Sequence, residues 1–246
     1  MSRELLDAAL DLLLGGCCAA CGAAGRALCE PCAAGLPTRP RLSWPTPAPA
    51  GLATPWAAGE YADPVRALVL AHKEHRVLAL RRPLSVLLAL AVAAGLPSGA
   101  PPTEALVLVP VPSRPSSVRA RGHDPTASLT RGAARLLRTQ GYDALAVPLL
   151  RTRPGLLDQA GLGAEARAAN LDGSLRCPAA GLRRLSRRRE RVRVVVCDDV
   201  ITTGATAREA QRALESVGLA VTAVAAVAAT RRIGGPRPLS SSPRTD

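Results

Sequence analysis

The chain has 246 residues, of which 48% are hydrophobic, and a formal net charge of +13 at pH 7. This length and composition are typical of one large folded domain, with or without a small added module, and exclude a chain that is mainly disordered. The charge favours phosphorylated or polyanionic partners, but a composition with no Phe, two Trp and two Tyr offers few rings on which bases could stack.

The N-terminal stretch is apolar over residues 5–14, but Glu4, Asp7 and Asp11 interrupt it as they would not in a signal peptide. Residues 84–96 form another apolar run, which is too short to span a bilayer and predicts a buried helix. We therefore expect no membrane span and a cytoplasmic location.

Five of the seven cysteines lie between residues 17 and 32. They include two CxxC pairs separated by seven residues, and four thiolates at this spacing can surround a zinc ion tetrahedrally. Such a site is closed, so its zinc would be structural rather than catalytic. Cys17 could replace Cys18 as the first ligand, and a disulfide is the competing explanation, which a reducing cytosol disfavours. The expected zinc ligands are Cys18, Cys21, Cys29 and Cys32.

The segment that follows the cysteines changes in character. Residues 37–56 contain six prolines and predict a stiff linker rather than part of the core. Apolar residues at helical spacing then predict a short helix over residues 65–72 and a second helix over residues 77–94. The histidines show no metal-ligand spacing, so we expect all three on the surface: His72, His75 and His123.

Strands and helices alternate after residue 104, which predicts an α/β domain with a parallel sheet covered by helices. The arginines between residues 183 and 193 predict an exposed helix face, with a polyanion-binding patch as the alternative. Residues 231–246 are rich in Ser, Pro, Gly and Arg and predict a disordered tail. The expected strands are residues 105–111, 144–150, 194–196 and 221–229, and the expected helices are residues 123–140 and 207–217.

The most informative segment is RVVVCDDVITTGAT, at residues 193–206. Its valines predict a strand buried on both faces, which places Asp198 and Asp199 at the strand end where open α/β sheets bind ligands. The two carboxylates suit sugar hydroxyls or a divalent metal, and the N–H groups of the helix start suit a phosphate monoester. The alternative is an acidic strand end capped by threonine side chains. The turn that opens the helix consists of Thr202, Thr203, Gly204, Ala205 and Thr206.

Carboxylates beside a phosphate cradle resemble the phosphoribosyl pyrophosphate (PRPP) loop of the type I phosphoribosyltransferases. The order of motifs over residues 18–229 is similar to that of the competence protein ComF family, which combines a cysteine knuckle, a helical segment with a lysine, a phosphoribosyltransferase-like sheet and a DDVxTTGxT loop. The stretch VPVPSRPSSVRARG at residues 109–122 resembles the family's VPVP strand end and RG motif. The family's later pattern is matched by Arg151, Gln159, Leu162, Arg167 and Asn170, and the family lysine by Lys73.

The resemblance implies a type I phosphoribosyltransferase-like domain over residues 57–230, joined by the linker to a zinc-knuckle module over residues 1–36. It implies binding of PRPP with magnesium, with Asp198 and Asp199 orienting the ribose hydroxyls or the metal during catalysis. Residues 152–170 would form a loop that closes over the site. Besides the turn residues, the PRPP-binding side chains would be Lys73, Arg114, Arg121, Arg151 and Arg167, with Arg119 nearby.

The chain departs from the related patterns at two places. His123, Asp124 and Pro125 stand where the family shows Phe-Asn-Gln after the RG motif. Thr202 stands where purine-salvage phosphoribosyltransferases tend to place an aspartate that acts on the base. Because a threonine cannot take up a ring proton at neutral pH, we do not expect a 6-oxopurine acceptor.

Three classes of function follow from these observations. The first is an enzyme that transfers phosphoribose from PRPP to a nitrogen acceptor. The second is a non-catalytic competence factor that serves DNA uptake by binding single-stranded DNA or proteins of the competence machinery. The third is a regulator that senses PRPP without turnover.

Overall fold

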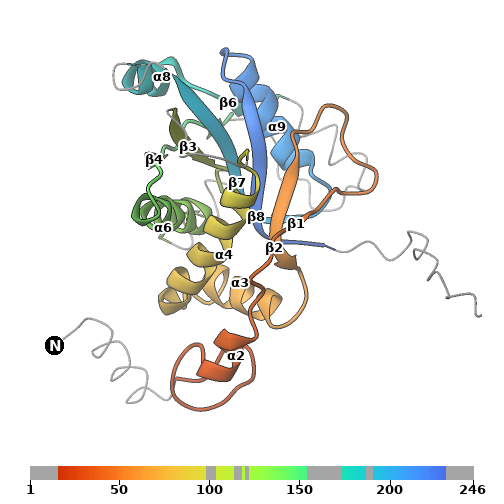
Figure 1. Cartoon of the computed structure of the whole chain (residues 1–246), viewed down its shortest axis with the longest axis vertical. Helices are drawn as coiled ribbons and strands as arrows, with labels where there is room; N and C mark the ends of the chain where they lie inside the picture. The colour runs from red at the N-terminus through yellow and green to blue at the C-terminus, as the bar shows by residue number, and fades with distance from the viewer. Residues whose placement is uncertain are drawn as a thin grey trace, which may run out of the picture.

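The computed structural model describes residues 16–97, 104–113, 118–119, 122–153, 173–186 and 191–230. These residues form an α/β fold around a six-stranded sheet with the strand order β1-β2-β8-β7-β3-β4 (Figure 1). Every neighbouring pair is parallel except β1 and β2. The strands are β1 Arg41–Leu42, β2 Pro55–Glu60, β3 Ala105–Pro110, β4 Ala144–Ala146, β7 Val192–Ile201 and β8 Val221–Ala229.

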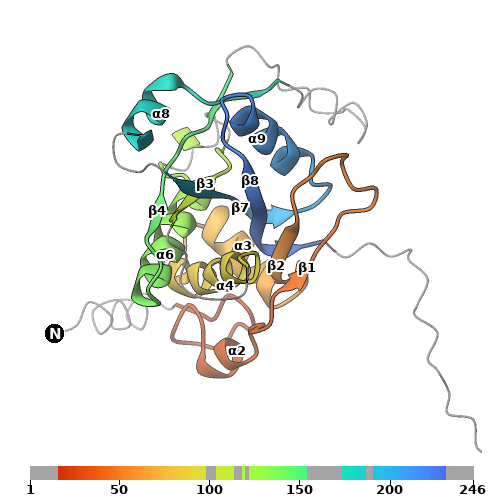
Figure 2. The same cartoon turned by 45° about the horizontal axis from the view of Figure 1, so that its top comes forward.

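Helices cover both faces of this sheet (Figure 2). On one face lie α3 (Val65–Lys73), α4 (Arg81–Ala94) and α6 (Pro125–Thr139), and on the other lies α9 (Ala205–Glu215). The remaining elements are α2 Glu30–Ala34, the 3₁₀-helix η1 Leu78–Leu80, α8 Ala179–Ser186, and a separate antiparallel pair of β5 Arg151–Thr152 with β6 Leu175–Arg176.

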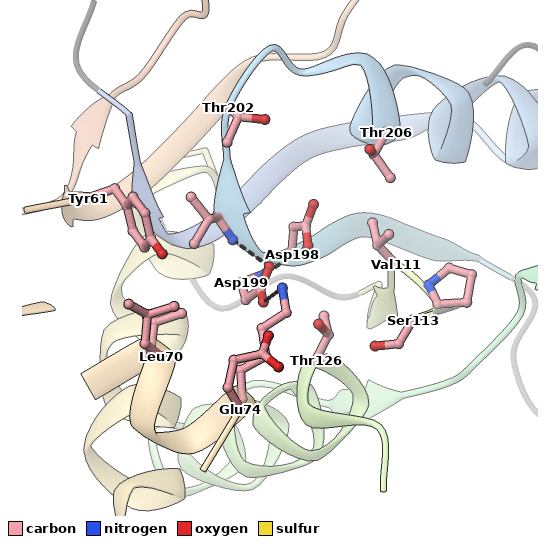
Figure 3. Close-up of a pocket in the computed structure, with 14 residues that line it drawn as sticks. Tyr61, Leu70, Glu74, Val111, Ser113, Thr126, Asp198, Asp199, Thr202 and Thr206 are labelled. Atoms are coloured by element: carbon pink, nitrogen blue, oxygen red, sulfur yellow. Dashed lines mark hydrogen bonds and ion pairs between the residues drawn. The ribbon is translucent and has the colours of Figure 1, made fainter. Parts of the chain in front are cut away.

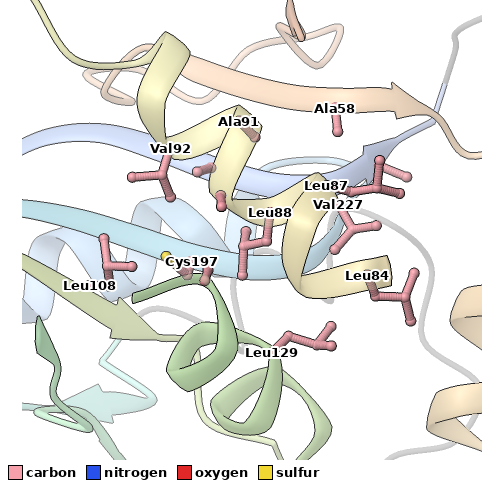
Figure 4. Packing of buried hydrophobic residues seen from close by; sticks show 14 of the residues in the cluster. Ala58, Leu84, Leu87, Leu88, Ala91, Val92, Leu108, Leu129, Cys197 and Val227 are labelled. Carbon is pink, nitrogen blue, oxygen red and sulfur yellow. The ribbon is translucent and has the colours of Figure 1, made fainter. Parts of the chain in front are cut away.

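Successive side chains along the central strands point to opposite faces of the sheet, and a hydrophobic core lies on each face. In β7, Val195 and Cys197 pack toward α4 and α6, whereas Val194 and Val196 pack toward α9. Leucines from the helices fill the first core, as Figure 4 shows for Leu84, Leu88 and Leu129. A chain nearly without aromatic residues thus fills its interior with Leu from the helices and Val and Ala from the strands.

Small residues let α4 and α6 approach closely. A Cβ atom at Gly132 in α6 would lie 2.1 Å from Oγ of Ser85 in α4, and Ser85 Oγ donates a hydrogen bond to the Leu129 carbonyl at 3.2 Å. This contact leaves no room for a side chain at residue 132, so the glycine sets the distance between the two helices.

The secondary structure agrees with most of the expected elements. β8 has the bounds predicted from the sequence, and β3, α3, α4 and α6 lie within a few residues of theirs. β4 is shorter than predicted, while β7 runs on to Ile201 and α9 begins at Ala205 rather than residue 207. The expected tail at residues 231–246 lies outside the described residues.

The proline-rich segment differs from the prediction. The expected linker at residues 37–56 contains all of β1 and the start of β2, and β2 pairs in parallel with β8 at the centre of the sheet. Leu52 within it is 6% exposed and belongs to the core beside α9. The prolines predict a locally stiff chain, but they carry no information about which distant strand the neighbouring residues pair with.

The cysteine-rich segment lies beside α3 and α4 in the fold. Ala27 belongs to the same core cluster as Leu68 and Leu88, and Leu28 and Leu36 pack against that cluster. Among the helices of the described residues, none is both long enough and apolar enough to cross a bilayer.

Candidate functional site

A pocket of about 380 Å³ lies at the carboxyl end of β7, between α3, α9 and the end of β3 (Figure 3). Asp198 and Asp199 both line it. They lie within the last four residues of β7, so the strand carries them into the pocket rather than ending before them. The described residues that line the pocket are Tyr61, Val69, Leu70, Lys73, Glu74, Val111, Pro112, Ser113, Thr126, Asp198, Asp199, Val200, Thr202 and Thr206.

Asp199 is the more tightly held of the two carboxylates. Its side chain is 9% exposed, and its Oδ2 lies 2.6 Å from Nζ of Lys73, which reaches it from the last residue of α3. Its Oδ1 accepts a hydrogen bond from the Val200 amide at 2.8 Å. Both carboxylate oxygens of Asp199 therefore have partners within the protein.

Asp198 has a different environment. Its Oδ1 accepts a hydrogen bond from the Asp199 amide at 2.8 Å. Burial raises the pKa of Asp198 well above its usual value, and the neighbouring charge of Asp199 raises it further. The side chain of Asp198 is thus the carboxyl group of this pair that can exchange a proton or meet a hydroxyl group of a ligand.

His72, which precedes Lys73 in the chain, is buried, and this corrects the expectation that all three histidines are on the surface. His72 is 1% exposed, and its ring lies 5.9 Å from that of His123, measured between centroids. Burial lowers the pKa of His72, so the neutral ring is favoured, and its Nδ1 lies 3.3 Å from the Val77 carbonyl oxygen. Only His75 is exposed as predicted.

The turn after the carboxylates opens α9 toward the pocket. Gly204 is the N-cap of α9 and has φ +74°, a left-handed conformation that favours glycine. Thr206, in the first turn of the helix, lines the pocket, so the first-turn amides, which have no intrahelical acceptor, lie at its edge. Thr202 also lines the pocket, and the Thr203 hydroxyl accepts a hydrogen bond from the Ala205 amide at 3.4 Å.

The proline-rich segment holds this turn from outside. A Cβ atom at Gly204 would lie 2.9 Å from Cγ of Pro45 and 3.2 Å from Cδ2 of Leu52. Further along α9, the Gln211 side chain accepts from the Ala53 amide at 2.8 Å and donates to the Gly51 carbonyl at 2.9 Å. The segment expected to be a linker is therefore a support for the N-terminus of α9.

On the other side of the pocket, Asp124 connects the end of β3 to the start of α6. Its Oδ1 accepts from the Ala127 amide and from the Ser113 hydroxyl, both at 3.1 Å. This N-cap fixes Ser113 and Thr126, which both line the pocket. Asp124, one of the residues at which the chain departs from the Phe-Asn-Gln pattern, thus caps the N-terminus of α6.

The predicted arginines do not form part of the described pocket. Arg114, Arg121 and Arg167 lie outside the described residues, as do Gln159, Leu162 and Asn170 and all but the first two residues of the expected closing loop. Arg151 lies in β5, where its guanidinium donates to the carbonyls of Pro148 and Leu150 at 3.1 and 3.0 Å. Arg119 is exposed. Lys73 is therefore the one basic side chain among the described residues that line the pocket.

Sequence reasoning missed Tyr61, Glu74, Ser113 and Thr126, which line the same pocket. They come from the end of β2, the residue after α3, the end of β3 and the start of α6. No local signal marks them, because each follows or begins an ordinary element and only the arrangement of these elements brings them together.

The described pocket does not fit a magnesium ion at Asp199. Magnesium binds carboxylate oxygens at about 2.0–2.1 Å and demands an octahedral set of oxygen ligands. Oδ2 of Asp199 already lies 2.6 Å from the Lys73 ammonium group, and Oδ1 accepts from a backbone amide. A cation at that oxygen would have to displace Lys73.

A separate site lies in the cysteine-rich segment. The sulfur atoms of Cys18, Cys21, Cys29 and Cys32 all lie within 4.8 Å of one another, a set that could hold a metal ion. Cys18 is buried and accepts from the Cys29 amide at 3.5 Å, whereas Cys17 is exposed. Cys18, rather than Cys17, is therefore the first member of the cluster, and four cysteines this close are consistent with structural zinc.

The ionisation of each of these thiols depends on the state of its neighbours. Burial alone would raise the pKa of Cys18, but hydrogen bonds from the Cys29 and Cys21 amides outweigh it and lower the value to about 6. The side chains of Cys29 and Cys21 raise the pKa of Cys32 to about 12. One thiolate thus suppresses the ionisation of the others, and a divalent cation would remove this repulsion.

No protein-family model matches the chain, and no curated protein matches it.

Proposed function

We propose that the pocket at the end of β7 binds a 5-phosphorylated ribose, and that the chain is a PRPP-binding, phosphoribosyltransferase-like protein of the ComF type. The observation that carries this proposal is that Asp198 and the first turn of α9 line the same pocket. A carboxyl group suits sugar hydroxyls and the free amides of a helix start suit a phosphate, so one ligand with both groups satisfies both features.

In this proposal each part of the site has one role. The first turn of α9, with the Thr206 hydroxyl, binds the 5′-phosphate. Asp198 accepts hydrogen bonds from the ribose hydroxyls, while Asp199 acts through Lys73. Arg114 and Arg121, which follow β3 in the chain, and Arg167 are proposed to meet the pyrophosphate.

Transfer would break the bond between the anomeric carbon and the pyrophosphate oxygen and form a bond from that carbon to the acceptor nitrogen, whose proton passes to the departing pyrophosphate or to water. Positive charge develops on the sugar as the pyrophosphate leaves, and this charge favours the ionised form of Asp198 and is stabilised by it. No step requires a metal bound to Asp199. Thr202 supplies no base for the ring proton of a 6-oxopurine, so the acceptor is proposed to be of another class.

The two CxxC pairs are proposed to hold one zinc ion with a structural role. Because Ala27 and Leu28 pack into or against the main core, the zinc would hold this segment in place beside α3 and α4. The ion would not take part in the reaction.

A titration by calorimetry with PRPP tests the proposed function. We expect binding to wild type and a loss of about 10-fold or more in affinity for Thr206→Val, which keeps the shape of the side chain and removes its hydroxyl. Thr222→Val, at the opposite end of β8 and exposed, is the matched control and should bind as wild type does. Absence of PRPP binding by a folded wild-type protein would end the proposal.

A second candidate is a non-catalytic factor that binds single-stranded DNA. The net charge of +13 and the exposure of Trp44, which is 48% exposed, favour it. Binding should weaken steeply as salt increases, because it depends on release of counterions from phosphates. If no affinity is measurable at about 50 mM salt, a direct role in binding nucleic acid is excluded.

A further inference from the structure

We propose that Lys73 takes the place of a divalent cation at the acidic end of β7, so that the pocket binds a pentose 5-phosphate without metal. The inference rests on the proposed function and departs from it in one respect, because the resemblance implied magnesium beside the two carboxylates.

The geometry of Asp199 is the first argument. Lys73 and Asp199 are 126 residues apart in the sequence, yet Nζ and Oδ2 are 2.6 Å apart where the end of α3 meets β7. A dashed line at Asp199 marks this ion pair in Figure 3. The Val200 amide binds the other oxygen of the same carboxylate at 2.8 Å. Asp199 thus has an ammonium group on one oxygen and a backbone donor on the other, and a metal ion at Oδ2 would have to displace Lys73.

The balance of charge is the second argument. The described residues that line the pocket include three acidic side chains, Glu74, Asp198 and Asp199, and one basic side chain, Lys73. A ligand with a phosphate group adds further negative charge. Without a cation among the carboxylates such a ligand would be repelled, and Lys73 is the described group placed to supply that charge.

The chemistry of lysine is the third argument. Lys73 is the only lysine of the chain, whose other basic residues are arginines. An ammonium group is a compact charge with three donors, whereas a guanidinium is a planar fork suited to bidentate carboxylate binding. In the bound state the ammonium group donates to a ribose oxygen, while Asp198 accepts from ribose hydroxyls. This pairing of donor and acceptor reproduces what a metal and a carboxylate would offer to a diol.

Calorimetric titration with ribose 5-phosphate tests the inference, because this probe has the sugar and the monoester but lacks the pyrophosphate that itself binds magnesium. The buffer is freed of divalent ions with a chelating resin and compared with the same buffer containing magnesium. We expect the affinity of wild type to agree within about twofold between the two buffers, since Lys73 already supplies the cation.

The variant Lys73→Met should lose about 10- to 100-fold in affinity in the metal-free buffer. Magnesium should restore much of that loss, because Asp198 and Asp199 are then open to the ion. Arg66→Met is the matched control, since Arg66 lies on the same helix, is exposed and is not among the pocket-lining residues. It should bind as wild type does in both buffers.

A direct measurement of metal binding makes the test independent of the sugar. Titration of the zinc-loaded protein with manganese, followed by the electron spin resonance signal of the free ion, should show one more bound ion per chain for Lys73→Met than for wild type. If the variant fails to fold, the comparison of wild type in the two buffers still decides.

The outcomes separate the inference from the function on which it rests. If wild type binds ribose 5-phosphate or PRPP only when magnesium is present, the inference is wrong and the proposed function stands. If a folded wild type binds neither compound in either buffer, both are wrong. Tight binding of manganese by wild type at the carboxylates would also overturn the inference.

Discussion

Gly204 at the start of α9 lies directly against Pro45, so that a Cβ atom on the glycine would be 2.9 Å from Cγ of the proline. The two residues are far apart in sequence, and their contact joins the proline-rich segment to the turn proposed to bind phosphate. The same glycine has φ +74°. Conformation and packing therefore both require glycine here, and the Cβ position points to the proline-rich segment.

Gly204→Ala should reduce the free energy of unfolding by about 2–4 kcal/mol, because a left-handed conformation costs a side chain about 1–2 kcal/mol and the contact with Pro45 adds a clash. Gly218→Ala is the matched control. Gly218 has φ +82° but a Cβ atom there would have no neighbour within 4 Å, so only the conformational cost remains. Urea unfolding of both variants measures the difference, and equal losses would show that the contact with Pro45 carries no energy.

Loss of charge at Asp198 and at Asp199 should change the free energy of unfolding in opposite directions. Asp199→Asn should lower the free energy of unfolding by about 1–3 kcal/mol, because it removes the charged end of the ion pair with Lys73 at a site where the carboxylate is 9% exposed. Asp198→Asn should raise stability at neutral pH, because it removes a charge that burial and Asp199 both disfavour. Equal effects of the two substitutions would contradict the environments described for them.

The difference in free energy of unfolding between Asp198→Asn and wild type should increase with pH. The pKa of Asp198 is raised in the folded state, so as pH increases the unfolded state releases this proton first and the stability of wild type falls. The advantage of Asp198→Asn should therefore be absent near pH 4 and increase toward about pH 7. Urea unfolding at several pH values measures it, and an advantage that shrinks as pH rises would exclude a raised pKa.

The contribution of Glu209 to stability should depend on pH in the opposite direction, and be lost in acid. Glu209 is 4% exposed, and its carboxylate binds the Leu175 amide at 2.8 Å and the Arg212 guanidinium at 2.6 Å. Burial alone would raise its pKa, but the bonds from Arg212 and Leu175 outweigh burial and lower the pKa. The stability that the ionised form contributes is present above the usual glutamate pKa and is lost as pH falls through the lowered value in the folded state.

Glu209→Gln should therefore destabilise the fold at neutral pH by about 1–2 kcal/mol and lose this effect in acid. The substitution also tests whether β6 is held to α9 through this side chain. Hydrogen exchange of the Leu175 amide should become faster in the variant. An unchanged exchange rate would mean that other contacts hold β6.

The cysteine cluster should bind one zinc ion per chain. Cys29→Ser with Cys32→Ser should abolish binding, because two of the four sulfur ligands are lost, whereas Cys17→Ser should leave it intact, since Cys17 is exposed and outside the cluster. Metal analysis of protein purified without a polyhistidine tag measures both. Thiol titration identifies the alternative, because a disulfide in wild type would lower the number of reactive thiols without any metal.

Local pattern was enough for the features that depend on a few consecutive residues. The segment VTAVAAVAA at residues 221–229 predicted β8 to its ends, since a strand buried on both faces over most of its length is apolar at nearly every position. The spacing of Cys18, Cys21, Cys29 and Cys32 predicted their cluster, because each CxxC pair is a single tight turn. The valines before Asp198 placed both carboxylates near the end of a central strand for the same reason.

The tertiary structure alone decided which partners these residues meet. Lys73 could be selected by resemblance, but its pairing with Asp199 depends on how α3 packs against β7. The burial of His72 and the contact between Gly204 and Pro45 likewise depend on layers that the chain brings together over long separations. A sequence pattern shows which face of a helix or strand is apolar, whereas the free energy of packing decides which other element covers that face. The choice of that element then decides which side chains meet in the pocket.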